Sequence, residues 1–143
     1  MNMRNKEQTY IFSKKQKEAI CLRLADLIKD DSHIQFAYIF GSFNDEIPIH
    51  DIDVGILLKG ILKKEATRFA LDLGGSLTKS LKIPVDIRIL NVAPIPFCFQ
   101  VLRGKLIYVQ DMEVHSMFLE DIMRRYLDIQ PILHRAAREA FSE

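Results

Sequence analysis

The chain has 143 residues, of which 48% are hydrophobic and 27% charged. This composition is typical of a globular domain and excludes a disordered, collagen-like or fibrous protein. The net charge is +1, from 20 Lys and Arg against 19 Asp and Glu, and proteins that bind mainly by coating nucleic-acid phosphates carry a larger basic excess, so strong nucleic-acid binding is not expected.

Helix and strand signals alternate in the first 60 residues. Ser13 is a good N-cap for a helix over 14–30, where apolar residues recur at helical spacing. The aromatic and β-branched run 34–40 predicts a buried strand, and the polar stretch 44–50 predicts a loop. Alternating residues then predict a second strand over 51–58. One of its faces is aliphatic and the other carries two aspartates, with the members Ile52, Val54, Ile56 and Leu58 against Asp51, Asp53 and Gly55.

The middle of the chain predicts one helix and one strand. Apolar spacing favours a helix over 63–80. The pair Gly74–Gly75 inside it costs about 1 kcal/mol per glycine relative to alanine, so we expect close packing against a neighbour or a break in the helix there. A third alternating strand is predicted over 85–90, with Asp86 and Arg88 on its polar face.

The last part of the chain is predicted to be mainly helical. Its expected features are a helix from Pro96 to Gly104, a strand over 106–109, and a helix over 113–130 that Pro131 should end or kink. We assign 1–143 to a single domain with one hydrophobic core. Within this domain, 1–12 is expected to be flexible and 112–143 to form a C-terminal helical segment.

The order of these elements indicates an α+β fold, in which helices cover a small mixed β-sheet. The two strands that flank the 41–50 loop follow each other closely in sequence, so they are expected to be neighbours in the sheet.

Compartment and oxidation state follow from cysteine use and hydropathy. Cys21 and Cys98 are far apart and lie among apolar residues, which fits neither a disulfide framework nor a zinc spacing. We therefore expect two buried free thiols. The N-terminal residues are polar and no apolar run approaches the ~20 residues that span a bilayer. These features predict a soluble, cytoplasmic protein that does not engage a membrane.

Asp51 and Asp53 are the first candidate site residues. Two residues apart in a strand, they would share a face about 6.6 Å apart. An Asp-x-Asp pair alone is usually the solvated edge of an amphipathic strand. Aspartate is a poor strand former, however, and a local preference is often sacrificed where function requires it. A divalent cation would relieve the repulsion between the two carboxylates.

Asp86 and the pair Gly41–Ser42 extend this candidate site. If the strands of Asp53 and Asp86 pair, three carboxylates can converge and bind one or two Mg²⁺ ions. The alternative for Asp86 is an ordinary surface ion pair with Arg88. Glycine lets a backbone approach a ligand, and the serine hydroxyl and nearby amides can receive phosphate oxygens. The alternative for Gly41–Ser42 is a simple strand-to-loop turn.

Taken together, these motifs resemble a known family. Gly41-Ser42-Phe43, Asp51-Ile52-Asp53-Val54 and Val85-Asp86-Ile87 are similar to the signature of the DNA polymerase β-like nucleotidyltransferase superfamily. The likeness is greatest to its stand-alone minimal nucleotidyltransferases, the MNT-type antitoxins that pair with HEPN ribonuclease toxins. The loop departs from the family pattern, because eight residues instead of about ten separate Ser42 from Asp51. Asn44-Asp45-Glu46 stands where the family commonly has an Ala-Arg-Gly-like run.

The resemblance implies a polymerase β-like fold and a metal-dependent transfer of AMP from ATP to a hydroxyl. Asp51, Asp53 and Asp86 would be the catalytic residues and would hold two Mg²⁺ ions, while Gly41 and Ser42 would bind the nucleotide phosphates. The implied acceptor is a tyrosine of a partner HEPN toxin, in a hetero-oligomer with this chain as the antitoxin.

Two alternatives to this function remain open. The acidic, shortened loop is compatible with a catalytically impaired antitoxin that neutralises its partner by direct binding. A nucleotidyltransferase acting on a small hydroxylated molecule is the other alternative, although 143 residues leave little room for the second domain that usually forms such an acceptor site.

Overall fold

The computed structural model of this protein describes residues 8–141. Its centre is a four-stranded sheet in the order β3-β2-β1-β4. The strands are β1 (Ile34–Phe40), β2 (Ile52–Leu58), β3 (Val85–Ile89) and β4 (Lys105–Val109). β1 is antiparallel to β2 and β4, whereas β2 and β3 are parallel. The predicted mixed sheet is confirmed, as is the pairing of the two strands that flank the 41–50 loop.

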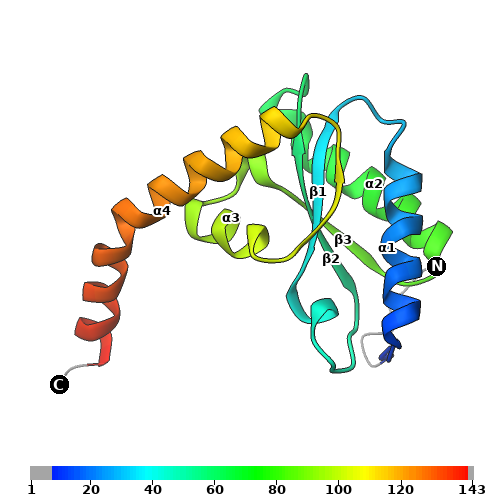
Figure 1. The fold of residues 1–143 in the computed structure, drawn as a ribbon, viewed down its shortest axis with the longest axis horizontal. Coiled ribbons are helices and arrows are strands. Elements are labelled where there is room, and N and C mark those ends of the chain that lie inside the picture. The colour runs from blue at the N-terminus through cyan, green and yellow to red at the C-terminus, as the bar shows by residue number, and fades with distance from the viewer. Residues whose placement is uncertain (1–7, 142–143) are drawn as a thin grey trace.

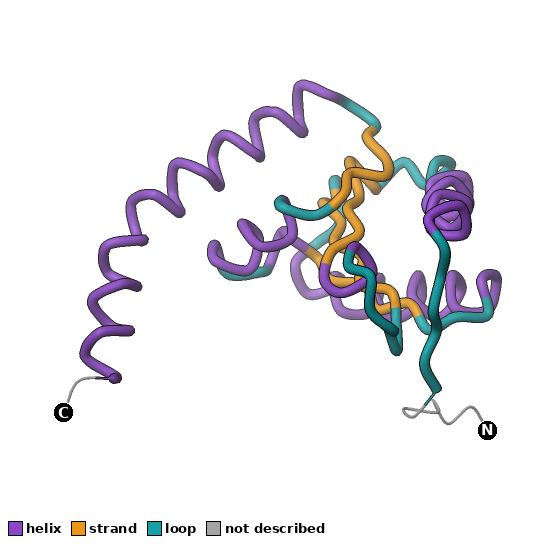
Figure 2. Tube along the Cα trace, turned by 60° about the horizontal axis from the view of Figure 1, so that its bottom comes forward, coloured by secondary structure: helices purple, strands orange, loops and turns teal. Residues whose placement is uncertain are grey.

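Four α-helices cover the two faces of this sheet. They are α1 (Lys14–Ile28), α2 (Ala66–Leu81), α3 (Ile95–Leu102) and α4 (Met112–Phe141). Figure 1 shows α1 and α2 on one side of the strands and α3 and α4 on the other, and Figure 2 gives the same layers from another direction. The expected α+β architecture is therefore confirmed.

The face under α1 and α2 is the larger part of the core. The aliphatic face of β2 is buried there, as its alternation predicts, together with Leu24 and Ile28 of α1. α1 begins at a capping box: Gln16 N donates to Ser13 Oγ (3.1 Å) and Ser13 N donates to Gln16 Oε1 (2.7 Å). The sequence pattern thus sets both the start of this helix and the face of β2 that it covers.

The packing of α2 on β3 accounts for the glycine at position 74. A Cβ at this position would lie 3.2 Å from the carbonyl oxygen of Val85, so the glycine allows helix and strand to approach closely. At Gly75 a Cβ would meet nothing within 4 Å. The helix is continuous through both residues, so close packing, and not a break, is the confirmed alternative at Gly74.

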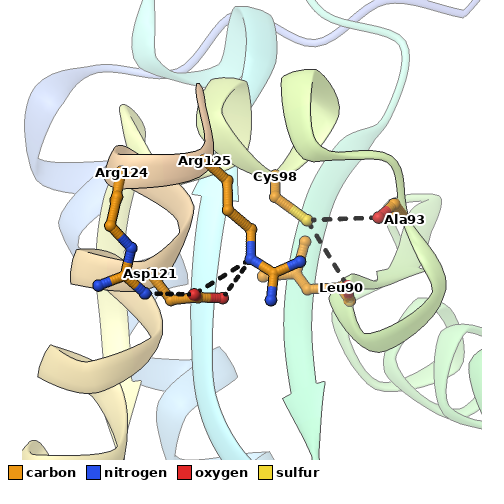
Figure 3. A network of polar contacts seen from close by, with 6 residues as sticks. All are labelled: Leu90, Ala93, Cys98, Asp121, Arg124 and Arg125. Carbon is orange, nitrogen blue, oxygen red and sulfur yellow. Dashed lines mark hydrogen bonds and ion pairs between the residues drawn. The ribbon is translucent and has the colours of Figure 1, made fainter. Parts of the chain in front are cut away.

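The opposite face of the sheet is covered by α3 and the first half of α4. Phe36 and Tyr38 of β1 pack there with Cys98 and Val101 of α3. Tyr38 Oη lies 2.6 Å from His115 Nε2 of α4 in a buried pair. Cys21 and Cys98 are buried and free, as expected. In Figure 3 the Cys98 thiol donates to the carbonyl oxygens of Leu90 (3.5 Å) and Ala93 (3.7 Å).

α4 does not end where its proline predicts. The helix continues through Pro131 to Phe141, so the expectation of a helix end is wrong. Its axis instead changes direction in the second half, where it projects from the rest of the fold (Figure 1). Pro131 has no N–H to donate to the preceding turn, which is a common cause of such bends. Within α4, Arg124 and Arg125 both pair with Asp121 (Figure 3).

The N-terminal segment is described from residue 8 onward. Of the stretch 1–12 that is expected to be flexible, residues 1–7 lie outside the described residues. Tyr10 forms an isolated bridge with Ile49, with backbone hydrogen bonds of 2.8 and 3.0 Å. Among the residues that the structure describes, no helix combines the length and the apolar character needed to cross a membrane.

Candidate functional site

The turn after β1 is a single 3₁₀ turn, Gly41–Asn44, with a fixed shape. Phe43 is buried in the core and anchors it. Asn44 Nδ2 donates to the carbonyl oxygen of Ile39 (3.0 Å), and Asp45 N donates to that of Ser42 (3.0 Å). Gly41 has a φ of +76°, a left-handed conformation that favours glycine. Ser42 is half-buried in the same turn.

Asp53 lies directly against this turn. It is the register partner of Phe40 on β1, the residue before Gly41. A Cβ added at Gly41 would lie 2.9 Å from Asp53 Oδ2, closer than such atoms approach in real structures. Glycine at position 41 is therefore required twice, by its backbone conformation and by the space that the Asp53 carboxylate occupies.

Asp86 faces Asp53 across the parallel ladder of β2 and β3. The two aspartates are register partners, and neighbouring strands are about 4.8 Å apart. Both lie on the polar face of their strand, opposite the buried aliphatic face. The pairing of these two strands, on which the predicted site depends, is therefore confirmed.

Asp86 also forms an ion pair with Arg88 on its own strand. Arg88 Nε lies 3.2 Å from Asp86 Oδ2, and the side chains are 60% and 38% exposed. The surface ion pair considered for Asp86 from the sequence is thus present. An exposed pair of this kind is worth less than about 1 kcal/mol, so it leaves Asp86 able to exchange partners.

Asp51 directly precedes β2, the strand that carries Asp53. β2 begins at Ile52, one residue later than predicted, so Asp51 is a half-buried residue of the preceding loop. Within residues 8–141, no three or more His, Cys, Asp or Glu side chains are grouped so that they could hold a metal ion. The structure brings Asp53, Asp86 and Gly41 to one corner, while the metal-binding roles of the three aspartates stay a prediction.

The shortened loop is held from outside by α1. Lys17 Nζ donates to the carbonyl oxygen of Asp45 (2.6 Å) and lies 5.7 Å from the centre of the Phe43 ring. The sequence analysis missed this contact, because nothing local links residues 28 positions apart. Lys17 is therefore a basic side chain beside the acidic loop.

A cavity of 750 Å³ beside Asp86 was also missed. It lies between α2 and β3, and its lining includes Asp86, Gly74 and Gly75. Gly75 is the sequence signal that could have revealed it, since a Cβ at this helix position would meet nothing within 4 Å.

The comparisons with known proteins define the class of this chain. The model of the family "Polymerase beta, Nucleotidyltransferase" matches residues 23–113. The chain therefore belongs to the polymerase β nucleotidyltransferase family, and the predicted class of enzyme is confirmed. The sequence has no significant match among curated proteins.

Solved structures with the same fold include toxin–antitoxin proteins. One is the tri-AMPylated HEPN toxin of Shewanella oneidensis in complex with its MNT antitoxin, with 21% identity, a TM-score of 0.69, and coverage of 88% of this chain and 99% of that chain. Another is the MntA–HepT toxin–antitoxin (20%, 0.68, 87% and 99%). A third is a toxin–antitoxin with AMP-PNP (21%, 0.66, 91% and 100%). At these identities the likeness establishes the polymerase β-like fold.

Proposed function

We propose that this chain is an antitoxin that transfers AMP from ATP to a tyrosine hydroxyl of a HEPN ribonuclease toxin. The observation that carries the proposal is the corner where the Asp53 carboxylate lies against Gly41 and opposite Asp86. It joins a turn suited to phosphate with carboxylates suited to cations. Membership in the nucleotidyltransferase family supports the reaction. The AMPylated toxin and the AMP-PNP complex among the similar structures support the acceptor and the nucleotide.

The donor chemistry of this corner fits magnesium. Asp51, Asp53 and Asp86 offer carboxylate oxygens, the ligands that Mg²⁺ prefers, and would hold two ions. Bound there, Mg²⁺ would stabilise the attacking and the leaving oxygen together. Gly41 has no side chain between its backbone and the Asp53 carboxylate. With Ser42 it would bind the β- and γ-phosphates through backbone amides and a hydroxyl.

The transfer forms one bond and breaks one. The tyrosine oxygen attacks the α-phosphorus of ATP, the bond from that phosphorus to the oxygen bridging it to the β-phosphate breaks, and pyrophosphate leaves. Asp86 takes the phenolic proton in this proposal, because it lies on the edge strand, farthest from the phosphate-binding turn. It must first separate from Arg88, and this exposed pair is weak enough to allow it.

The test is incorporation of labelled AMP from ATP into the purified partner toxin. Asp51→Asn and Asp53→Asn, singly and together, should lower the rate about a hundredfold or more. Asp72→Asn is the matched control, since Asp72 is an exposed α2 residue in an i,i+4 pair with Arg68 and should leave the rate unchanged. Full labelling by the double variant would reject the proposed reaction.

Two observations favour a second function, neutralisation of the toxin by contact alone. Asp86 is engaged by Arg88, and the loop that carries an arginine in the family has Asp45 and Glu46 here. An assay of protection in cells that produce the toxin distinguishes the two functions. Protection by a variant with all three aspartates replaced by asparagine would support contact, and loss of protection would support transfer.

A further inference from the structure

The outer edge of β3 presents backbone groups to solvent. β3 ends the strand order of the sheet, and within residues 8–141 no strand pairs with its other side. Ile52 N donates to the carbonyl oxygen of Pro84 (2.9 Å), and Ile52 is the register partner of Val85. In a parallel ladder this places the backbone groups of Asp86 and Arg88 toward β2, and those of Val85, Ile87 and Ile89 toward the free edge.

This edge is bordered by an open apolar groove on the α2 side. Two cavities, of 750 and 450 Å³, lie between α2 and β3 and share Ala70, Leu71 and Ile87 in their linings. Leu71 is 69% exposed, and Gly75 has open space where a Cβ would stand. A free strand edge beside a groove that has apolar residues at its centre and charged residues along it is an arrangement that can receive an extended peptide.

The charges along the groove indicate the character of that peptide. Lys79 and Lys82 line the larger cavity and Arg88 lines the smaller one. Among the described residues that line either cavity, Asp86 is the only acidic one. An acidic side chain near the Val85 end of β3 would therefore be favoured there, and a basic one disfavoured.

We propose that β3 binds the acceptor protein through an extended segment that adds to the sheet as a further strand. Because side chains alternate between the two faces of a strand, apolar residues entering the groove place the residue between them on the face of Asp86. A tyrosine flanked on both sides by apolar residues would thus have its hydroxyl beside Asp86. This inference rests on the proposed transfer of AMP to a protein hydroxyl, and it assigns the surface that presents that hydroxyl.

Gly75→Leu is the variant that tests the groove. Its side chain would fill the larger cavity, and its Cβ meets no neighbour within 4 Å, so α2 should form at least as well as with glycine. Ser76→Leu is the matched control. Ser76 is the next residue on the same helix, is exposed, and lines neither cavity.

The direct measurement is peptide binding to the full chain by fluorescence anisotropy. The probe is a labelled peptide of about nine residues, with a tyrosine between two valines and two acidic residues at one end. We expect Gly75→Leu to weaken binding about tenfold or more and Ser76→Leu to leave it unchanged. Two methylated peptides test the strand pairing: one carries an N-methyl group on the tyrosine nitrogen, the other on both valine nitrogens. Alternate backbone groups of an added strand face β3, so at least one of these two peptides should not bind.

The outcomes separate this inference from the proposed function. No binding by the wild-type chain, equal binding by Gly75→Leu, or tolerance of both methylation patterns would overturn the inference. So would a dimer in sedimentation that Gly75→Leu dissociates, since the edge would then serve a second copy. AMP transfer to the toxin that is slowed by Gly75→Leu, with unchanged ATP binding, would support it. A wild-type chain that transfers no AMP would refute the function, while the peptide result still decides the docking surface.

Discussion

Gly41→Ala is the sharpest perturbation of the corner at Asp53. The backbone there has a φ of +76°, and a residue with a Cβ in the left-handed region costs about 1–2 kcal/mol. The new Cβ would also stand 2.9 Å from Asp53 Oδ2. The carboxylate is the end of a side chain and can rotate away, at a cost of about 0.5–1.5 kcal/mol if it leaves its rotamer. We therefore expect a loss of about 2–3 kcal/mol in the free energy of unfolding.

Gly60 supplies the matched control for this experiment. Its φ is +75°, and a Cβ there would meet only His33 Cδ2, at an ordinary 3.7 Å. Gly60→Ala should thus carry the backbone cost of about 1–2 kcal/mol alone. It displaces no residue of the candidate site.

Urea unfolding and AMP transfer to the toxin, measured on both variants, give the comparison. We expect similar losses of stability, within about 1.5 kcal/mol of each other. Transfer should be lost only in Gly41→Ala, because only that variant moves the Asp53 carboxylate. Wild-type transfer by Gly41→Ala, or an equal loss of transfer in both variants, would refute the geometry that we assign to the site.

Four further substitutions test helix packing, the burial of His115 and the ion pair of Arg88. Gly75→Ala should raise the free energy of unfolding by about 0.5–1 kcal/mol in urea, whereas Gly74→Ala should gain less, because its Cβ would press on β3 at 3.2 Å. Burial lowers the pKa of His115, so the unfolded chain binds this proton more tightly. The contribution of neutral His115 to the free energy of unfolding is complete above about pH 6.5 and is lost as the pH falls below it. Urea midpoints measured against pH should show this loss, and His115→Gln should reduce their dependence on pH. Arg88→Ala should change stability by less than about 1 kcal/mol, and a larger loss would mean that the exposed pair is structural.

The sequence predicted the parts of this fold that local patterns determine. The alternation in β2 and β3 gave the correct buried faces, and Ser13 gave the correct start of α1. Of the two outcomes predicted at Pro131, an end or a kink, the structure shows a bend, in the second half of α4, which projects from the body. There a bend costs no core packing, so the helix can continue past a residue that lacks its donor.

The sequence predicted that the strands of Asp53 and Asp86 pair, while the roles of the site residues stay a prediction. The motifs identified Asp53, Asp86 and Gly41 as members of one site, and the register of β2 and β3 confirms that the two aspartates face each other. The contact of Asp53 with Gly41 depends on how β1 turns into the loop, which no local pattern specifies. The same holds for Lys17, which reaches the loop across 28 positions.

The choice between an ion pair and a metal ligand for Asp86 is not exclusive. Asp53 and Asp86 are register partners on neighbouring strands, so their carboxylate charges repel each other. The exposed pair of Asp86 with Arg88 offsets only a small part of such a cost. The left-handed backbone at position 41 restricts this position of the same corner to glycine. Constraints that gather at one point, while the strands around them follow their preferences, are expected where a binding requirement has overridden folding preference. In the proposed function, Arg88 is the resting partner of Asp86, and a divalent cation with phosphate would replace it as the stronger partner.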